Sequence, residues 1–324
     1  MVKAIRITET GGPEVLKLVD VDLADPGAGE VQVKHKAIGL NYIDTYFRTG
    51  LYPAPIPCGL GLEAAGVVTK VGDGVTTLKE GDRVAYGSGP LGAYSEAQNA
   101  PANRLVKVPD GVSDKDAAAM MLKGMTAHYL LRRTYEVKAG DTILFHAAAG
   151  GVGLIACQWA KHLGATVIGT VGSEEKAALA KQAGADHTIL YRDEDVPARV
   201  REITDGKMVP VVYDGVGKDT FEMSLNCLAP LGLLASFGNA SGPVPPFDLS
   251  ILNLKGSLFV TRPSLAAYTA SDEDLAMTAA ELFEVMAKGA VKADVRQEYA
   301  LADAAQAHKD LEGRKTTGAT VLIP

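Results

Sequence analysis

The chain has few cysteines, no long apolar run and no excess of positive charge. Its three cysteines, Cys58, Cys157 and Cys227, are far apart and odd in number. We therefore expect a reducing compartment, and neither a disulfide framework nor a cysteine metal cluster. No run of about 18 or more apolar residues occurs, which argues against a membrane-spanning helix. A net charge of −7 and a pI near 5.5 argue against a general nucleic-acid or anionic-membrane surface.

The first twelve residues, Met1 to Gly12, lack the apolar stretch of a signal peptide, so we expect a cytoplasmic protein. The chain has 324 residues, of which 47% are hydrophobic and 22% are charged. This is an ordinary globular composition, and the length suggests two domains.

The stretch from Thr142 to Gly172 has the pattern of a strand, a turn, a helix and a second strand. The apolar segment Thr142–Phe145 is short enough for a buried parallel strand, and the β-branched segment Ala165–Thr170 predicts another. Between them, apolar residues recur at helical spacing as far as Gly164. A unit of about 30 residues in this order is typical of a βαβ crossover.

The turn of this unit reads Ala148-x-Gly150-x-x-Gly153, the dinucleotide fingerprint with alanine in its first position. Small residues let the chain leave the strand sharply, let a pyrophosphate approach the backbone and let the helix pack closely on the strand. The helix N-terminus also presents unpaired N–H groups to an anion. The residues expected to bind a dinucleotide here are Ala149, Gly150, Gly151 and Val152. The alternative is a tight turn without a ligand.

The end of the second strand indicates which dinucleotide binds. An NAD site has Asp or Glu about 20 residues past the fingerprint, where it binds the ribose 2′-hydroxyl. This chain instead has Gly172 and Ser173, followed by Lys176. No carboxylate repels a 2′-phosphate there, and Ser173 and Lys176 can donate hydrogen bonds to it, so NADPH is favoured. The two glutamates between them count against this, unless they only enrich a helix N-terminus in acid. Lys176 is otherwise a solvated helix lysine.

The rest of the chain divides into a β-rich part and an alternating part. Residues 1 to about 110 contain short strands broken by Gly and Pro, which predicts a barrel-like domain. Among them are a hairpin of Lys3–Thr8 with Val15–Asp20 and a strand at Ala93–Gln98. Helical spacing begins at Ser113, whose side chain we expect to cap the helix. Strands and helices then alternate as far as Thr261, which predicts a doubly wound parallel sheet and an α/β fold.

Six motifs stand in order along the chain: Asn41-x-x-Asp44, Gly61-Leu62-Glu63-x-x-Gly66, Gly81-Asp82-Arg83-Val84, Ala147–Gly153, Tyr213-Asp214-x-Val216-Gly217 and Phe237-Gly238-Asn239. Together they closely resemble the zinc-free quinone oxidoreductases (zeta-crystallin type) of the medium-chain dehydrogenase/reductase superfamily. The resemblance covers essentially the whole chain. It implies a GroES-like catalytic domain made of residues 1–124 and 263–324, and a Rossmann domain for NADPH at residues 125–262. It also implies a cleft between the two domains and a homodimer.

The likeness is to the zinc-free members because the ligand positions of the zinc-dependent relatives are changed. Those enzymes have Cys where this chain has Asn41, and His where it has Leu62. A leucine side chain has no lone pair for a metal, and an amide is a poor substitute for a thiolate. Tyr86–Gly92 replaces the lobe with four cysteines that holds their structural zinc. We expect no metal, and we expect His146 to be a packed core residue.

Without a metal, the protein mainly has to position a quinone, which accepts hydride readily because its product is aromatic. The resemblance places Asn41, Tyr46 and Tyr52 at the nicotinamide and the substrate. Asn41 either orients the nicotinamide, binds a substrate oxygen or only caps a turn. The two tyrosines either stack on a planar ring and donate a hydroxyl, or pack at an interface. Asp44 is expected to be structural.

The resemblance adds cofactor contacts outside the fingerprint. It implies that Tyr191 packs on adenine or reaches the 2′-phosphate, and that Thr126 lies near the phosphates. The Phe237-Gly238-Asn239 motif is expected to line the nicotinamide at the carboxyl end of a strand, where open α/β sheets bind ligands. Arg262 and Arg314 are expected either to close the cleft or to be ordinary surface residues.

Three functions are consistent with these residues. The first is an NADPH:quinone oxidoreductase that passes hydride or electrons to a small quinone, without a nucleic acid or membrane partner. The second is a zinc-free enoyl-thioester reductase, which shares the Asn41-x-x-Asp44 motif and in which a tyrosine matching Tyr52 protonates the α-carbon. The third is a non-catalytic, NADPH-loaded binding or structural protein, for which the acidic pI argues against RNA as a ligand.

Overall fold

The computed structural model describes residues 1–324, which form two compact units. The β-rich unit consists of Met1–Met125, Thr269–Phe283 and Ala293–Pro324, and the parallel-sheet unit consists of Thr126–Tyr268 and Glu284–Lys292. Within the parallel-sheet unit, the rings of Tyr129 and Tyr268 stack with centroids 4.7 Å apart. The side chain of Gln158 bonds both the N–H and the carbonyl of Lys292. These contacts attach the last residues of both segments to that unit.

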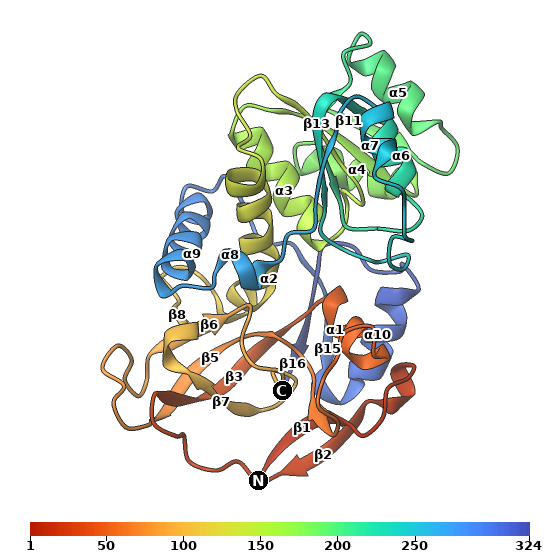
Figure 1. The fold of residues 1–324 in the computed structure, drawn as a ribbon. Coiled ribbons are helices and arrows are strands. Elements are labelled where there is room, and N and C mark those ends of the chain that lie inside the picture. The colour runs from red at the N-terminus through yellow and green to blue at the C-terminus, as the bar shows by residue number, and fades with distance from the viewer. The chain divides into compact units, whose positions relative to one another are not determined.

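Antiparallel pairing dominates the β-rich unit (Figure 1). The predicted hairpin is confirmed, because β1 (Val2–Ile7) pairs with β2 (Lys17–Val21), and β4 (Cys58–Gly59) extends the same sheet. The larger sheet contains β3 (Glu30–Leu40), β5 (Glu63–Val71), β6 (Arg83–Tyr86), β7 (Ala97–Pro101), β8 (Val106–Lys107), β15 (Val295–Ala300) and β16 (Ala319–Ile323). Its order is β15-β16-β3-β5-β6-β8, and β7 pairs with β3.

The bounds predicted for the strand at Ala93–Gln98 were wrong, because β7 begins only at Ala97. The backbone N–H of Tyr94 instead donates to the carbonyl of Leu60 at 2.8 Å, outside the ladder of β7. A Cβ on Gly61 would lie 2.3 Å from the Tyr94 ring. Glycine at that position therefore lets the buried tyrosine pass below the loop.

Four helices of at least eight residues lie wholly or partly in this unit: α1 (Tyr42–Thr49), α2 (Asp114–Tyr129), α9 (Asp272–Ala287) and α10 (Ala304–Glu312). The predicted cap of α2 is confirmed, since the backbone N–H of Asp116 donates to Ser113 Oγ at 3.0 Å. The division between the two units falls inside α2, after Met125.

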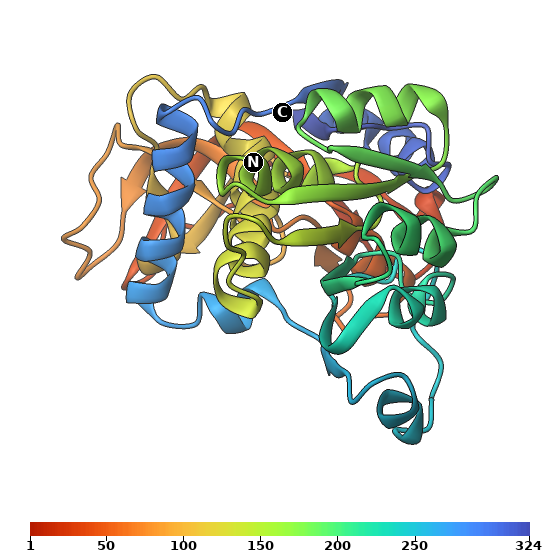
Figure 2. The same ribbon diagram turned by 90° about the horizontal axis from the view of Figure 1, so that it is seen from above.

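The parallel-sheet unit contains a six-stranded parallel sheet, which confirms the doubly wound α/β prediction (Figure 2). Its strands are β9 (Thr142–Phe145), β10 (Thr166–Val171), β11 (His187–Leu190), β12 (Val209–Asp214), β13 (Leu228–Ser236) and β14 (Phe259–Thr261). Their order is β11-β10-β9-β12-β13-β14. Counted from β9, this is the order 3-2-1-4-5-6 of dinucleotide-binding sheets, whose switch point lies between β9 and β12.

Helices flank both sides of this sheet. The helices α3 (Gly151–His162) and α4 (Glu174–Gln182) contact each other, and so do α5 (Val196–Ile203) and α6 (Phe221–Asn226). Leu144, Ile168 and Val212 on the three central strands are fully buried in the core below these helices. The core thus fixes the strand ends from which the candidate site is built.

Candidate functional site

The turn after β9 exposes backbone groups at the switch point of the parallel sheet. Gly150 is the N-cap of α3, and Ala147 takes a left-handed conformation with φ of 53°. The N–H of Leu154 donates to the carbonyl of Gly150 at 2.9 Å. The three N–H groups before it therefore point out of the helix N-terminus, where the helix dipole attracts anions. The structure brings Ala149, Gly150, Gly151 and Val152 together in this turn.

The third glycine of the fingerprint is required by packing. A Cβ on Gly153 would lie 2.5 Å from the carbonyl oxygen of Ala147 and 2.6 Å from that of Ala148. On β10, a Cβ on Gly169 would lie 2.6 Å from the Cβ of Ala148. Helix α3 can start this close to the strands only because these two positions lack side chains.

The end of β10 brings Gly172, Ser173, Lys176 and Tyr191 together. Ser173 is the N-cap of α4, and its Oγ accepts from the N–H of Lys176 at 3.4 Å. The Ser173 side chain also hydrogen-bonds Glu175 and so lowers the pKa of that carboxyl. A Cβ on Gly172 would lie 2.8 Å from the Tyr191 hydroxyl, so the tyrosine covers this glycine.

Sequence reasoning missed Arg192, which follows Tyr191. Its guanidinium carbon lies 6.0 Å from the centroid of the Tyr191 ring, within the range of a cation–π contact. The Arg192 side chain is exposed. Through Tyr191, which covers Gly172, it adds a second cation to Lys176 near the end of β10. A basic residue two positions after a parallel strand was the signal that could have identified it.

The ends of β13 and β14 bring Asn239 and Arg262 together. Arg262 Nη1 donates to the carbonyl of Ser236 at 2.7 Å. Its Nη2 lies 3.0 Å from the Asn239 amide oxygen, in the amide orientation that also lets the nitrogen donate to Gly238 O. The Phe237 ring packs 5.7 Å from that of Phe145 on β9. A cavity of about 290 Å³ is lined in part by Asn239 and Arg262.

Beneath these strand ends lies a buried set of His, Ser and Asp side chains. Ser224 Oγ donates to Asp214 Oδ2 at 2.8 Å and accepts from His146 Nε2 at 3.0 Å, while His146 Nδ1 lies 2.8 Å from Thr170 Oγ1. Because the serine proton is directed at the aspartate, this is no nucleophilic triad. The set ties β9, β10 and β12 together. His146 is 1% exposed, which confirms its predicted core position, and burial lowers its pKa.

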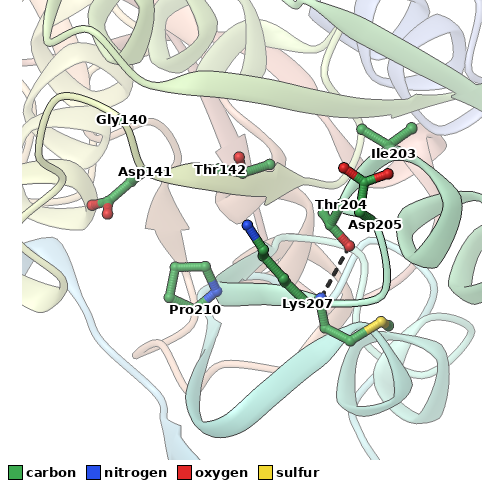
Figure 3. Close-up of a pocket in the computed structure, with 9 residues that line it drawn as sticks. Gly140, Asp141, Thr142, Ile203, Thr204, Asp205, Lys207 and Pro210 are labelled. Atoms are coloured by element: carbon green, nitrogen blue, oxygen red, sulfur yellow. Dashed lines mark hydrogen bonds between the residues drawn. The ribbon is translucent and has the colours of Figure 1, made fainter.

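A larger hollow of about 380 Å³ lies at the opposite edge of the same sheet (Figure 3). It is lined by Thr142 and Pro210, near the amino ends of β9 and β12, and by Asp205 and Lys207 in the loop after α5. Ligands of open α/β sheets bind at the carboxyl ends of the strands. This hollow is therefore not part of the candidate nucleotide site.

In the β-rich unit, Asn41 is the N-cap of α1. Its backbone N–H donates to Asp44 Oδ2 at 2.9 Å, and its side chain faces the N–H of Asp44, which completes a capping box. Its Nδ2 donates to Glu63 Oε2 at 2.7 Å. The capping role is thus present in the structure, and the two ligand-binding roles stay predictions.

The structure brings Tyr46 and Tyr52 together. Their ring centroids lie 5.2 Å apart in an edge arrangement, and the N–H of Tyr52 donates to the carbonyl of Tyr46 at 3.0 Å. Tyr42 packs against Tyr46 with centroids 5.7 Å apart. Tyr46 is buried and Tyr52 is half-buried. Tyr46 therefore supports the more accessible Tyr52.

Sequence reasoning also missed Lys123, and it used Glu63 only as part of a motif. Lys123 Nζ lies 3.0 Å from Glu63 Oε2, and the two side chains are 7% and 0% exposed. Glu63 begins the otherwise apolar start of β5, and Lys123 follows an apolar run in α2. A charge inside an apolar segment was the available signal, because such a charge needs a partner when buried.

A chain of buried hydrogen bonds leads away from Asp44. The Tyr94 hydroxyl donates to Asp44 Oδ2 at 2.8 Å and lies 3.1 Å from His308 Nε2. Arg48 Nη1 lies 2.9 Å from His308 Nδ1, and the guanidinium makes a bidentate pair with Glu312 at 2.8 and 2.9 Å. A guanidinium can only donate, so His308 carries its proton on Nε2. The structural role predicted for Asp44 is confirmed.

Burial shifts two groups in this chain in opposite directions. Burial raises the pKa of Asp44 from 3.8 to about 7. Burial, together with the Arg48 charge, lowers the pKa of His308 to about 3. Both shifts favour the neutral form, as expected for groups removed from water.

The last two predicted cofactor residues lie in different units. Thr126 is buried on α2 and is the first residue of the parallel-sheet unit. Arg314 is in the β-rich unit, two residues after the end of α10, with a left-handed φ of 57°. Its charge is close enough to Tyr42 to oppose the rise in the pKa of that hydroxyl, which burial causes.

No group of three or more His, Cys, Asp or Glu side chains in residues 1–324 is arranged to hold a metal ion. Among the helices of the structure, none has the length and apolar character needed to cross a membrane.

Two known families match the chain. Residues 27–110 match the alcohol dehydrogenase GroES-like domain, and residues 151–281 match the family described as zinc-binding dehydrogenase.

Three relatives are similar over the full length. The chain is 59% identical to a quinone oxidoreductase of Pseudomonas aeruginosa over 325 residues, which is 100% of each chain. It is 46% identical to a 2-haloacrylate reductase of a Burkholderia species, over 100% of this chain and 99% of the relative. The crystal structure of Escherichia coli quinone oxidoreductase complexed with NADPH superimposes with a TM-score of 0.98 at 55% identity, covering 99% of this chain and 100% of that one.

Proposed function

The chain belongs to the quinone oxidoreductases of the medium-chain dehydrogenase/reductase superfamily, and we propose that it reduces small quinones with NADPH. The observation that carries the proposal is the carboxyl edge of the parallel sheet. There the fingerprint turn lies at the switch point, and β10 ends without a carboxylate. The relative whose structure contains NADPH matches this chain over 99% of its length.

The residues at this edge fit NADPH. We assign the pyrophosphate to the turn Ala149–Val152, where the N–H groups of Gly151 and Val152 point out of the helix N-terminus and Gly153 lets α3 pack close to the strands. We assign the 2′-phosphate to Ser173 and Lys176, with Tyr191 and its neighbour Arg192 beside them. Two hydroxyls and two cations, with no carboxylate on the strand end, favour the phosphate over a free 2′-hydroxyl.

We assign the nicotinamide end to Phe237, Gly238 and Asn239. Asn239 is braced there by Arg262, while Thr126 and Arg314 are assigned to the cofactor by resemblance alone. In this proposal the parallel-sheet unit is the Rossmann domain and the β-rich unit is the GroES-like catalytic domain. When bound, NADPH supplies the hydride.

Asn41, Tyr46 and Tyr52 are the residues we assign to catalysis. A quinone needs orientation more than polarisation, because hydride addition makes an aromatic product. The half-buried Tyr52, supported at its edge by Tyr46, presents a ring face and a hydroxyl to a planar substrate. Its hydroxyl can donate a hydrogen bond to a quinone oxygen.

The 46% identity to a 2-haloacrylate reductase supports a second candidate function, reduction of a carbon–carbon double bond conjugated to a carboxyl group. The enoyl-thioester alternative belongs to the same chemistry. Initial rates with a small quinone, a 2-haloacrylate and an enoyl thioester separate these functions. A clear preference for either alkene would refute quinone reduction as the main activity.

The direct test of the proposed function is the loss of NADPH absorbance on adding a small quinone, after dialysis against a metal chelator. We expect turnover to survive the chelator and to be much faster with NADPH than with NADH. NADPH binding without turnover of any acceptor would favour the non-catalytic alternative.

We also propose a homodimer formed through the edge of the parallel sheet at β14. Four large apolar side chains near this edge are exposed: Leu231 by 67%, Leu249 by 72%, Leu254 by 81% and Phe259 by 60%. Leu254 ends the short helix α7 (Ser250–Leu254), and Phe259 begins β14. An unpaired strand edge with an apolar surface favours association. Sedimentation should give a dimer, and Phe259→Lys should give a monomer.

We propose that the protein is cytoplasmic. Its three cysteines are free and buried, which fits a reducing compartment. Fractionation of the native cells, followed by detection of the chain, tests this. Recovery in the membrane or extracellular fraction would contradict it.

A further inference from the structure

Asp214, the last residue of β12, is a buried carboxylate whose partners all donate hydrogen bonds. Its Oδ1 accepts from the N–H of Val216 at 2.8 Å and from that of Gly217 at 3.1 Å. The Thr220 hydroxyl lies 2.8 and 2.7 Å from its two oxygens, and Ser224 Oγ donates to Oδ2 at 2.8 Å. None of these partners is a cation. The carboxylate therefore depends on the segment that wraps it, and that segment depends on the carboxylate.

The loop after β12 (residues 215–220, the β12 loop) is bonded to the loop after β13 (residues 237–242, the β13 loop). Ser241 joins them through its backbone and its side chain. Its N–H and its Oγ both donate to the carbonyl of Val216, at 2.8 and 2.9 Å, and its Oγ accepts from the N–H of Asp219 at 3.0 Å. These bonds make the position of one loop depend on that of the other.

The two loops also pack closely through glycines. A Cβ on Gly238 would lie 2.3 Å from the carbonyl oxygen of Gly215. A Cβ on Gly217, whose φ of 93° is left-handed, would lie 2.6 Å from the carbonyl oxygen of Gly242. Because no space separates the backbones, a change in the shape of the β12 loop must displace the β13 loop. The β13 loop contains the Phe237-Gly238-Asn239 motif, which is assigned above to the nicotinamide end.

We infer that Asp214 is a positioning residue for the nicotinamide end of NADPH. By fixing the β12 loop it fixes the β13 loop, and with it the Phe237-Gly238-Asn239 motif. The inference rests on the proposed function in taking this motif as the nicotinamide contact. It gives a task to the Tyr213-Asp214-x-Val216-Gly217 motif, to which the proposed function assigns none. Asp214 acts through the two loops, because its carboxylate is buried and bonded within the protein.

The first experiment compares NADPH with 2′-phospho-ADP-ribose, a fragment that keeps the adenine, the 2′-phosphate and the pyrophosphate but has no nicotinamide. Calorimetry gives the dissociation constants of both ligands for the wild type and for Asp214→Ala. The variant leaves the N–H groups of the β12 loop without their acceptor. It should weaken NADPH by about 2- to 10-fold, the value of one neutral hydrogen bond, and leave the fragment unchanged. Equal weakening of both ligands, or of neither, would overturn the inference.

Asp214→Asn is the companion variant, because its amide oxygen can take the place of Oδ1. It can then accept from the N–H groups of Val216 and Gly217, while the hydroxyls of Thr220 and Ser224 accept from its nitrogen. Asp214→Asn should therefore recover most of the NADPH affinity that Asp214→Ala loses. If the two variants bind NADPH equally weakly, Asp214 does not act by holding the N–H groups of the loop.

The second experiment changes the junction of the loops and leaves Asp214 intact. Ser241→Ala removes the Oγ bonds to Val216 and Asp219 and keeps the backbone bond. It should weaken NADPH and not the fragment. In this background Asp214→Ala should cause a smaller further loss than in the wild type, because both changes release the same loop. Losses that simply multiply would show that the two residues act independently and would overturn the inference.

Thr220→Val keeps the test decisive if Asp214→Ala does not fold. It preserves the shape of the side chain and removes the hydroxyl that lies between the two carboxylate oxygens. It should shift the ratio of the two dissociation constants in the same direction as Asp214→Ala. A folded Thr220→Val with the wild-type ratio, together with a Ser241→Ala that also keeps it, would overturn the inference.

Asp141→Ala is the matched control, because Asp141 Oδ2 also accepts from a backbone N–H, that of Lys138 at 2.9 Å. Asp141 directly precedes β9, at the opposite edge of the same sheet. Its loss should leave the ratio of the two dissociation constants intact. A changed ratio would show that the ratio reports general destabilisation, which would overturn the inference.

Two outcomes for the wild type separate this inference from the proposed function. A wild type that binds NADPH no more tightly than the fragment would refute the assignment of the nicotinamide end, and this inference with it. A wild type that prefers NADPH to the fragment but reduces no quinone would refute only the proposed function, since calorimetry needs no turnover.

Discussion

The two units offer a ligand different kinds of groups. In the parallel-sheet unit, the N–H groups at the start of α3 belong to the backbone and lie within one turn. In the β-rich unit, the side chain of Asn41 is held by Glu63, 22 positions away, which in turn is paired with Lys123, 60 positions further on. A ligand site made of backbone groups is disturbed by substitutions that add atoms. A site held by buried charged side chains is disturbed by substitutions that remove a charge.

The largest effect is expected from removing a buried charge in the β-rich unit. Arg48 is 1% exposed, and its guanidinium donates hydrogen bonds to Glu312, His308 and the carbonyl of Gly11. Arg48→Met should lower the free energy of unfolding by about 3–5 kcal/mol, because it leaves these acceptors unpaired. Urea denaturation followed by fluorescence measures the change.

The control for Arg48→Met is Lys115→Met. Lys115 pairs with Glu298 in the same unit, but both side chains are about half exposed, at 52% and 49%. Such a surface pair contributes about 0–1 kcal/mol. Similar losses for the two variants would show that burial does not distinguish the charges of this unit.

The next effect concerns a charge in the parallel-sheet unit that acts on the ligand rather than on the fold. Lys176→Ala should weaken NADPH binding by about 10- to 100-fold, the value of one charge-assisted hydrogen bond, and leave NADH binding nearly unchanged. Lys181→Ala, in the last turn of the same helix, should change neither. Equal loss for both cofactors would show that the 2′-phosphate does not bind at Lys176.

A smaller effect is expected from adding one methyl group to the fingerprint turn. Gly153→Ala should cost about 1–3 kcal/mol of stability, because its Cβ would meet the carbonyl of Ala147 at 2.5 Å. At Gly150 the same contact would be 3.1 Å, so Gly150→Ala should keep its melting temperature and lose NADPH affinity instead. If Gly153→Ala instead lost NADPH affinity and Gly150→Ala lost stability, the third glycine of the fingerprint, Gly153, would serve the ligand rather than the packing.

The backbone-built region was predictable from the sequence because its causes are local. The turn, the helix start and the small residues at Gly150 and Gly153 stand within one stretch, and each follows from a rule about neighbouring residues. The alternation of strands and helices then predicted the doubly wound parallel sheet, but not its strand order. The missing carboxylate at Gly172 could be read in the same way. Arg192 was missed because its contact with Tyr191 depends on side-chain orientation.

The side-chain-built region could be predicted only in part. The helix Tyr42–Thr49 and the structural role of Asp44 follow from local pattern. The partners of Asn41 do not, because Glu63 and Lys123 come from β5 and α2 and meet only in the folded unit. The same holds for the contact between Arg48 and His308, which are 260 positions apart. The strand at Ala93–Gln98 was misplaced for this reason, since pairing of Tyr94 with Leu60 decides where β7 begins.

The last expected effect is a change in the pH dependence of stability at Asp44. Burial raises its pKa from 3.8 to about 7, and neighbouring Glu63 acts in the same direction, while Lys123 and the Tyr94 hydroxyl oppose it. The folded state thus retains a proton that the unfolded state loses. The stability from Asp44 is therefore complete below about pH 4 and is lost as the pH rises to about 7.

Asp44→Asn should remove this loss. An asparagine oxygen in the place of Oδ2 can still accept from Asn41 N–H and Tyr94. Its nitrogen takes the place of Oδ1, which has no hydrogen-bond partner, so the variant starts from a lower stability. Melting temperatures of both proteins between pH 5 and pH 8 should differ most at pH 5 and converge toward pH 8, because only the wild type has a carboxyl to ionise. Curves that stay parallel over this range would show that the Asp44 carboxylate is already ionised in the fold, stabilised by the Asn41 N–H, the Tyr94 hydroxyl and the Lys123 charge rather than neutralised by burial.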